Sequence, residues 1–206
     1  MGAPTVGPCT GPASPVAGIL LTGGASRRMG FDKARLPVDG VPLGARLGRL
    51  LQGVVAPVVE VGPGVSWLPA LQEDPPGQGP LVAMCAGACR LGEMGHAGPV
   101  LVLACDLPFM TSAVLAELAA WPPARSSVVP VVAGRPQPLC ARWSQAALGA
   151  AYRLADQGER AMKCLFECAD VVFLDEKQWG TEGVARAFAD VDSPADLKAL
   201  GLRPYA

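Results

Sequence analysis

A glycine-rich, basic segment follows the first apolar run of the chain. It reads Leu21-Thr22-Gly23-Gly24-Ala25-Ser26-Arg27-Arg28-Met29-Gly30-Phe31-Asp32-Lys33. Glycines just past a strand let the backbone approach a ligand closely, and consecutive N–H groups there can converge on phosphate oxygens. Arg27, Arg28 and Lys33 add positive charge. The segment therefore suits a phosphate-bearing ligand, and the alternative is a glycine turn with solvated arginines.

The segment does not match two common phosphate-binding patterns. No Gly-Lys-Ser/Thr sequence ends it, as a P-loop requires, and it lacks the Gly-x-Gly-x-x-Gly spacing of dinucleotide-binding loops. The segment is therefore neither a P-loop nor a dinucleotide-binding loop.

Carboxylates supply the candidate metal ligands. Asp106 directly follows the apolar run of residues 99–105, which is typical of a buried parallel strand. Mg²⁺ prefers one or two carboxylates together with phosphate oxygens and water, so Asp106 is the candidate ligand. Asp190 and Asp192 could supply a second carboxylate, or they could belong to a solvated acidic face.

The chain offers little for nucleophilic catalysis or for a zinc site. His96 is the single histidine, so no Ser-His-Asp or Cys-His arrangement can be recognised. The cysteine pairs Cys85/Cys89 and Cys164/Cys168 stand four residues apart on two separate expected helices. We interpret them as small packing residues. The odd total of seven cysteines fits reduced thiols in a cytoplasm.

Composition limits the classes of partner. The 206 residues carry 17 Lys plus Arg against 18 Asp plus Glu, so no global positive field exists to hold a nucleic-acid polymer or an anionic membrane. Residues 1–50 nevertheless hold six basic residues against two acidic ones. No apolar run approaches the roughly 20 residues that span a bilayer, so we expect a cytoplasmic protein without a membrane partner.

Strand-like and helix-like periodicities alternate along the chain. We expect strands at 17–22, 54–61, 69–73, 99–105, 126–132, 138–143 and 170–174, and helices at 42–52, 81–91, 111–120, 144–156, 159–168 and from 193. This order predicts an α/β fold with three layers, a mostly parallel central sheet with helices on both faces. Residues 1–16, rich in Gly, Pro and Ala, are expected to form a flexible leader before a single domain at 17–206.

The glycine-rich segment resembles the signature of the molybdopterin nucleotidyltransferases, above all of the molybdenum cofactor guanylyltransferases. The resemblance covers residue 18 to about residue 200. It continues at Glu73-Asp74, Gly79-Pro80-Leu81, Cys105-Asp106-Leu107-Pro108-Phe109, Gly134-Arg135-Pro136-Gln137-Pro138-Leu139, Gly158-Glu159-Arg160 and residues 188–197.

The resemblance implies a Rossmann-like nucleotidyltransferase fold and the transfer of GMP from GTP to molybdenum-loaded molybdopterin, with Mg²⁺ as cofactor and pyrophosphate as product. It also implies transient contact with molybdopterin-loading proteins or recipient molybdoenzymes. Carried over by position, the nucleotide-binding residues are Leu21, Thr22, Gly23, Gly24, Lys33, Asp74 and Asp106. Arg28 and Lys33 would offset the charge of the leaving pyrophosphate, and Asp106 would also bind the metal.

Some positions depart from the family pattern and leave alternatives open. Glu60 stands where the guanylyltransferases have Asn, and Asp190 and Asp192 stand where Asn is common. The same chemistry with CTP, giving a cytosine dinucleotide, is therefore a second hypothesis. A third is a module that binds nucleotide or pterin without catalysis, and a fourth is a sugar-phosphate nucleotidyltransferase.

Overall fold

The computed structural model describes residues 16–23, 32–124 and 126–202. Within them one sheet has the strand order β10-β7-β9-β6-β1-β4-β5, and β8 pairs with β7 at one end. Its strands are β1 (Ala17–Leu21), β4 (Val58–Val61), β5 (Ala70–Leu71), β6 (Val100–Ala104), β7 (Ser127–Val132), β8 (Arg135–Pro136), β9 (Cys140–Trp143) and β10 (Val171–Asp175). The strands β2 (Pro37–Val38) and β3 (Val41–Pro42) form a separate antiparallel pair.

The sheet is mostly parallel, as expected. The strand β1 lies between β4 and β6 and is parallel to both, and β7 is parallel to β10. The strand β9 is inserted antiparallel between β6 and β7. The carboxyl ends of β4, β1 and β6 therefore meet at one edge of the sheet, which is where open α/β sheets bind ligands.

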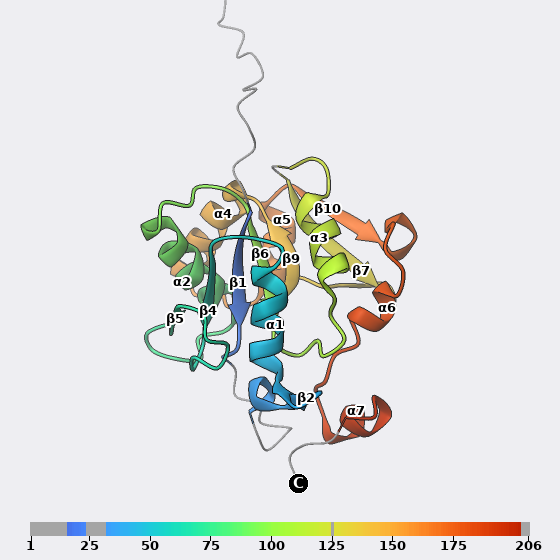
Figure 1. The fold of residues 1–206 in the computed structure, drawn as a ribbon. Helices are drawn as coiled ribbons and strands as arrows, with labels where there is room; N and C mark the ends of the chain where they lie inside the picture. The colour runs from blue at the N-terminus through green and yellow to red at the C-terminus, as the bar shows by residue number, and fades with distance from the viewer. Residues whose placement is uncertain (1–15, 24–31, 125, 203–206) are drawn as a thin grey trace, which may run out of the picture.

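Helices cover both faces of the sheet (Figure 1). They are α1 (Leu43–Gln52), α2 (Pro80–Glu93), α3 (Ser112–Ala120), α4 (Gln145–Asp156), α5 (Leu165–Cys168), α6 (Val184–Ala187) and α7 (Pro194–Ala199). The helices α1 and α3 lie on one face, and α2, α4 and α5 lie on the other. In the described part of the chain, no helix combines the length and the apolar character needed to cross a bilayer.

The alternation of side chains along the central strands builds a core on each face. Leu101 and Leu103 of β6 pack with α1 and α3, whereas Val100 and Val102 pack with α2 and α4. Continuous apolar strands are what a sheet covered on both faces requires. The three-layer α/β prediction is therefore confirmed.

Hydroxyl side chains begin several helices. The Thr111 hydroxyl accepts from the Val114 amide at the start of α3, and the Ser144 hydroxyl accepts from the Ala147 amide at the start of α4. Such caps satisfy amides that have no partner within the helix. The start of the third helix at Thr111 was predicted from the sequence.

Two predicted elements begin three or more residues later in the structure than expected. The strand expected at 54–61 begins only at Val58, because the amides of Val54 and Val55 continue the end of α1 by donating to the Leu51 carbonyl. The helix expected at 159–168 is shortened to a 3₁₀ turn at Met162–Cys164 followed by α5. The preceding Arg160 carbonyl is used to accept from the Leu81 amide.

Short elements were the ones that the sequence did not indicate. The chain turns after β7 at Ala133 and Gly134, which both have positive φ. Arg135 and Pro136 instead form the strand β8 against β7. The one-turn helix α6 was also not predicted.

Candidate functional site

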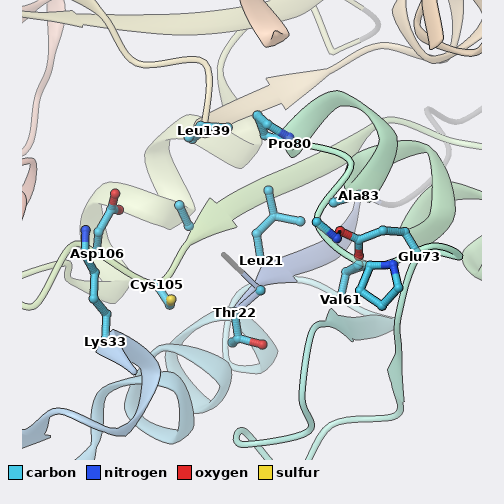
Figure 2. Close-up of a pocket in the computed structure, with 15 residues that line it drawn as sticks. Leu21, Thr22, Lys33, Val61, Glu73, Pro80, Ala83, Cys105, Asp106 and Leu139 are labelled. Carbon is cyan, nitrogen blue, oxygen red and sulfur yellow. Dashed lines mark hydrogen bonds between the residues drawn. The ribbon is translucent and has the colours of Figure 1, made fainter. Parts of the chain in front are cut away.

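A cavity of about 570 Å³ lies at the carboxyl edge of the central strands. Leu21, Thr22 and Gly23 line it from the end of β1, Val61 from the end of β4, and Asp106 from just beyond β6. Figure 2 shows Lys33 and Asp106 at one end of this cavity and Glu73 at the other. Its volume is within the range of small-molecule sites in proteins.

Residues 22 and 23 are held against the end of β4. The amides of Thr22 and Gly23 donate to the Val61 carbonyl at 3.0 and 3.2 Å. Gly62 makes this close approach possible, since a Cβ there would lie 2.6 Å from the Gly23 nitrogen and 2.1 Å from the Thr22 hydroxyl oxygen. The exit of β1 is thus fixed before the glycine-rich segment begins.

Glu60, which stands where the family has Asn, is a buried residue that holds neighbouring segments together by hydrogen bonds. Its side chain is fully buried and accepts hydrogen bonds from the Thr22 hydroxyl, the amides of Gly64 and Val65, and the amide and hydroxyl of Ser66. Burial alone would raise the pKa of Glu60, but the hydrogen bonds from Ser66, Thr22 and the backbone outweigh it and lower the pKa below 4.5. Glu60 therefore stays ionised and does not line the cavity.

Lys33 brings a positive charge to the cavity from a short 3₁₀ turn, Lys33–Arg35. The Asp32 carboxylate caps this turn by accepting from the Ala34 amide at 3.0 Å. The Lys33 ammonium forms an ion pair with the carboxylate of Asp192, which is half exposed. The pair joins the amino-terminal part of the chain to the segment before α7.

Asp106 lies just past the end of β6, and its loop is tied to the carboxyl-terminal segment by the Val191 amide, which donates to the Asp106 carbonyl at 2.9 Å. Burial raises the pKa of the Asp106 carboxyl to about 6, with Asp192 and Asp190 adding to the rise and Lys33 opposing it. A carboxylate with a perturbed pKa that faces a cavity is a candidate functional group.

The donor set at this end of the cavity fits a magnesium ion bound together with a nucleotide. No cluster of three or more His, Cys, Asp or Glu side chains suited to a metal occurs among the described residues. Mg²⁺ does not need one, because substrate phosphates and water complete its coordination. Asp106 is the carboxylate that lines the cavity at this end, and Asp190 and Asp192 are close enough to shift its pKa.

The structure brings together most of the site residues that the sequence singled out. Leu21, Thr22, Gly23, Lys33 and Asp106 all line the same cavity.

Three further predicted site residues are not placed in the cavity. Gly24 and Arg28 lie outside the described residues, so their roles stay predictions. Asp74 is exposed and does not line the cavity. Its backbone carbonyl accepts from the Gln78 side-chain amide at 3.0 Å.

Sequence reasoning assigned no role to Glu73, the residue before Asp74. Glu73 is half-buried and lines the cavity. The sequence shows two adjacent carboxylates here, and it does not show which of them faces the cavity.

Among the remaining reactive side chains, Cys105 lines the cavity, but it is buried and burial raises the pKa of its thiol well above the ordinary value. His96 is not a lining residue, and its Nε2 atom is 3.0 Å from the Pro99 carbonyl oxygen. All cysteines in residues 16–23, 32–124 and 126–202 are free. Burial raises the pKa of the Cys85 thiol to about 11, which suits a packing role.

The comparison with protein families gives the class of this protein. Residues 18–175 match the model of the MobA-like NTP transferase domain, and the chain belongs to this family. A protein of Chloroflexus aggregans is 31% identical over 90% of this chain and 93% of its own length. A protein of Mycobacterium tuberculosis is 33% identical over 90% of this chain and 92% of its own length. Both carry the name "Probable molybdenum cofactor guanylyltransferase".

Solved structures share the fold at lower identity. Molybdopterin-guanine dinucleotide biosynthesis protein A of Archaeoglobus fulgidus superimposes with a TM-score of 0.74 at 22% identity, covering 89% of this chain and 96% of that one. The 2-C-methyl-D-erythritol 4-phosphate cytidylyltransferase of Thermus thermophilus gives a TM-score of 0.61 at 20% identity, covering 89% and 97%. Because a cytidylyltransferase has the same fold, the fold alone does not select the nucleobase.

Proposed function

We propose that this protein transfers GMP from GTP to molybdenum-loaded molybdopterin, which gives the guanine dinucleotide cofactor and pyrophosphate. The observation that carries the proposal is a nucleotide-sized cavity with the Lys33 ammonium and the Asp106 carboxylate at one end, at the carboxyl edge of β1 and β6. Family membership and the names of the two relatives support the choice of substrates.

The proposed step is an in-line displacement at the α-phosphate of the nucleotide. An oxygen of the terminal phosphate of molybdopterin forms the new bond to the α-phosphorus. The bond from that phosphorus to the bridging oxygen breaks, and pyrophosphate leaves with the electron pair. A phosphate monoester is largely dianionic at pH 7, since its second pKa is about 6, so the step requires no general base.

Catalysis of such a step depends on positioning and charge neutralisation. The Lys33 ammonium would offset the negative charge that develops on the leaving pyrophosphate. Asp106, with Asp190 or Asp192 as a second carboxylate, would hold Mg²⁺. When bound, the ion would supply Lewis-acid stabilisation of the phosphate oxygens.

The surroundings of Glu60 remove one of the reasons for the CTP alternative. The replacement of Asn by Glu60 was one of the sequence features that kept CTP open, together with Asp190 and Asp192. Both oxygens of Glu60 accept hydrogen bonds from Thr22 and the 64–66 segment, so the carboxylate is not free to contact a base. The departure from the pattern is thereby explained by a structural role, without a change of nucleotide.

The proposal is tested with Mg²⁺, GTP, molybdenum-loaded molybdopterin and the Asp106→Asn variant. The wild-type protein should release pyrophosphate, and Asp106→Asn should lose activity by about 10²-fold or more, as for loss of a main electrostatic contact to a transition state. Asp170→Asn removes an exposed carboxylate at the opposite end of the sheet and should retain activity. Tight nucleotide binding without turnover would contradict the proposal and favour a carrier module.

A further inference from the structure

Glu73 places a carboxylate at the end of the cavity away from Lys33 and Asp106. Figure 2 shows its side chain directed into the cavity, toward the space between Leu21 and Pro80. The Gly77 amide donates to Glu73 Oε1 at 2.9 Å, which fixes the orientation of the carboxylate. This single hydrogen bond leaves Glu73 able to accept further hydrogen bonds from a ligand, since the two oxygens of a carboxylate offer about four lone pairs.

The walls near Glu73 suit a flat aromatic ring. Val61, Pro80 and Ala83 give this end small apolar surfaces. Gly77 and Gly79 also line it, and a Cβ at Gly77 would meet nothing within 4 Å. A purine ring can bind between these surfaces, because ligand pockets in proteins are mostly apolar and carry only a few polar groups.

The polarity of the cavity sets the direction of a bound nucleotide. The ammonium of Lys33 and the metal-binding carboxylate of Asp106 lie at the phosphate end. The nucleobase must then lie toward Glu73. The other polar side chain that lines the middle of the cavity, Thr22, already donates its hydroxyl proton to Glu60. Glu73 is thus the charged side chain that meets the edge of the base.

An ionised carboxylate accepts hydrogen bonds and donates none, so it selects a base edge with donors. Guanine presents two adjacent donors, N1–H and the N2 amino group, which match the two oxygens of one carboxylate. Cytosine and adenine present one amino group beside an unprotonated ring nitrogen, whose lone pair would face the second oxygen. Uracil presents one N–H between two carbonyl oxygens.

We propose that Glu73 reads the N1–H and N2 amino edge of guanine and is the residue that selects GTP against CTP. This inference rests on the proposed function and adds the specificity residue to it. It assigns base reading to Glu73 rather than to Asp74, which is exposed outside the cavity and which the family resemblance had suggested for the nucleoside contact.

The test measures nucleotide affinity by titration calorimetry with Mg²⁺ and without acceptor. The nucleotides are GTP, CTP and ITP, whose hypoxanthine base lacks only the 2-amino group of guanine. The wild-type protein should bind GTP about 10- to 100-fold more tightly than ITP, because the missing bond is charge-assisted. Glu73→Gln and Glu73→Ala should reduce this ratio to within about threefold, with the loss mostly in GTP affinity.

Control variants separate base reading from a general change of charge. Glu182→Gln removes an exposed carboxylate on the segment before α6 and should keep the wild-type ratio. Asp74→Asn is not a control but the test of the alternative reader that the family resemblance implies, and the inference predicts the wild-type ratio for it. Thermal unfolding of each variant without nucleotide checks that the variants remain folded.

The possible outcomes distinguish this inference from the proposed function. Preference of the wild-type protein for CTP, or binding of neither GTP nor CTP, would contradict the proposed function and the inference together. Preference for GTP with an unchanged GTP-to-ITP ratio in both Glu73 variants would overturn the inference alone. If Asp74→Asn, rather than the Glu73 variants, loses the GTP-to-ITP affinity ratio, then Asp74 contacts the base and the inference is wrong. Equal affinity of the wild-type protein for GTP and ITP would also overturn the inference.

Discussion

A single buried carboxylate organises the exit of the central strand. Glu60 has no exposed surface, and its hydrogen bonds come from Thr22 on one side and from the 64–66 segment on the other. A buried charge is tolerated only where several donors replace its hydration. The strand end that forms the cavity floor therefore depends on a residue that does not itself line the cavity.

Replacing Glu60 by Gln should lower the free energy of unfolding at pH 7 by about 1–3 kcal/mol. The amide has one acceptor oxygen, and its NH₂ group would face N–H and O–H donors. Urea unfolding at pH 7 measures the difference, with Glu182→Gln as the exposed control.

The difference between wild type and Glu60→Gln should depend on pH. The folded-state pKa of Glu60 lies below its ordinary value of 4.5, so its stabilisation is complete above pH 4.5. It is lost as the pH falls through the lower folded-state pKa. Equal stability of the two proteins at pH 7, or a difference that grows in acid, would contradict the anchoring role.

At the scale of elements, a buried arginine joins β9 to the end of α3. Arg142 has no exposed surface and donates to the carbonyls of Ala119 and Pro123, both at 2.7 Å, and to that of Ser126. A cation near the last carbonyls of a helix also interacts favourably with the helix dipole. No acidic side chain pairs with Arg142 in the described part of the chain.

Arg142→Met should therefore destabilise the fold by about 3 kcal/mol, because it leaves buried carbonyls without donors. Arg153→Met, at an exposed position of α4, should change stability by less than about 0.5 kcal/mol. Denaturant unfolding of both variants measures the contrast. Similarly small changes in stability for both variants would contradict this role and would show that water replaces Arg142 as the donor to these carbonyls.

At the scale of the whole molecule, the site is assembled from segments that are far apart in the chain. The Lys33–Asp192 ion pair and the Val191–Asp106 hydrogen bond join the carboxyl-terminal segment to the cavity. Although the net charge of the chain is close to zero, charged side chains are thus concentrated at the Lys33 and Asp106 end of the cavity. This arrangement suits a small ligand that carries phosphate groups at one end.

The sequence predicted the layers of the fold because the long elements carry strong periodicity. The apolar runs of β1 and β6 and the Thr111 cap of α3 were recognisable without tertiary information. Short elements such as β8 and α6 were not, since one turn or two residues hold too few positions for a period. Their conformations depend on partners elsewhere in the chain.

The same distinction applies to the site. Lys33 and Asp106 were predicted because their motifs surround them in the sequence, and the structure brings both to the cavity. The anchoring by Glu60 was not predictable, because its donors depend on how the 62–66 segment folds back. The choice between Glu73 and Asp74 likewise depends on how the segment after β5 folds, which places Glu73 in the cavity lining and leaves Asp74 exposed.

The most direct test of the account is the identity of the dinucleotide formed when Mg²⁺, molybdenum-loaded molybdopterin and equal concentrations of GTP and CTP are offered together. We predict that the wild-type protein forms the guanine dinucleotide with stoichiometric pyrophosphate, and that Asp106→Asn forms about 10²-fold less. A cytosine dinucleotide as the main product, or no dinucleotide from either nucleotide, would contradict the account.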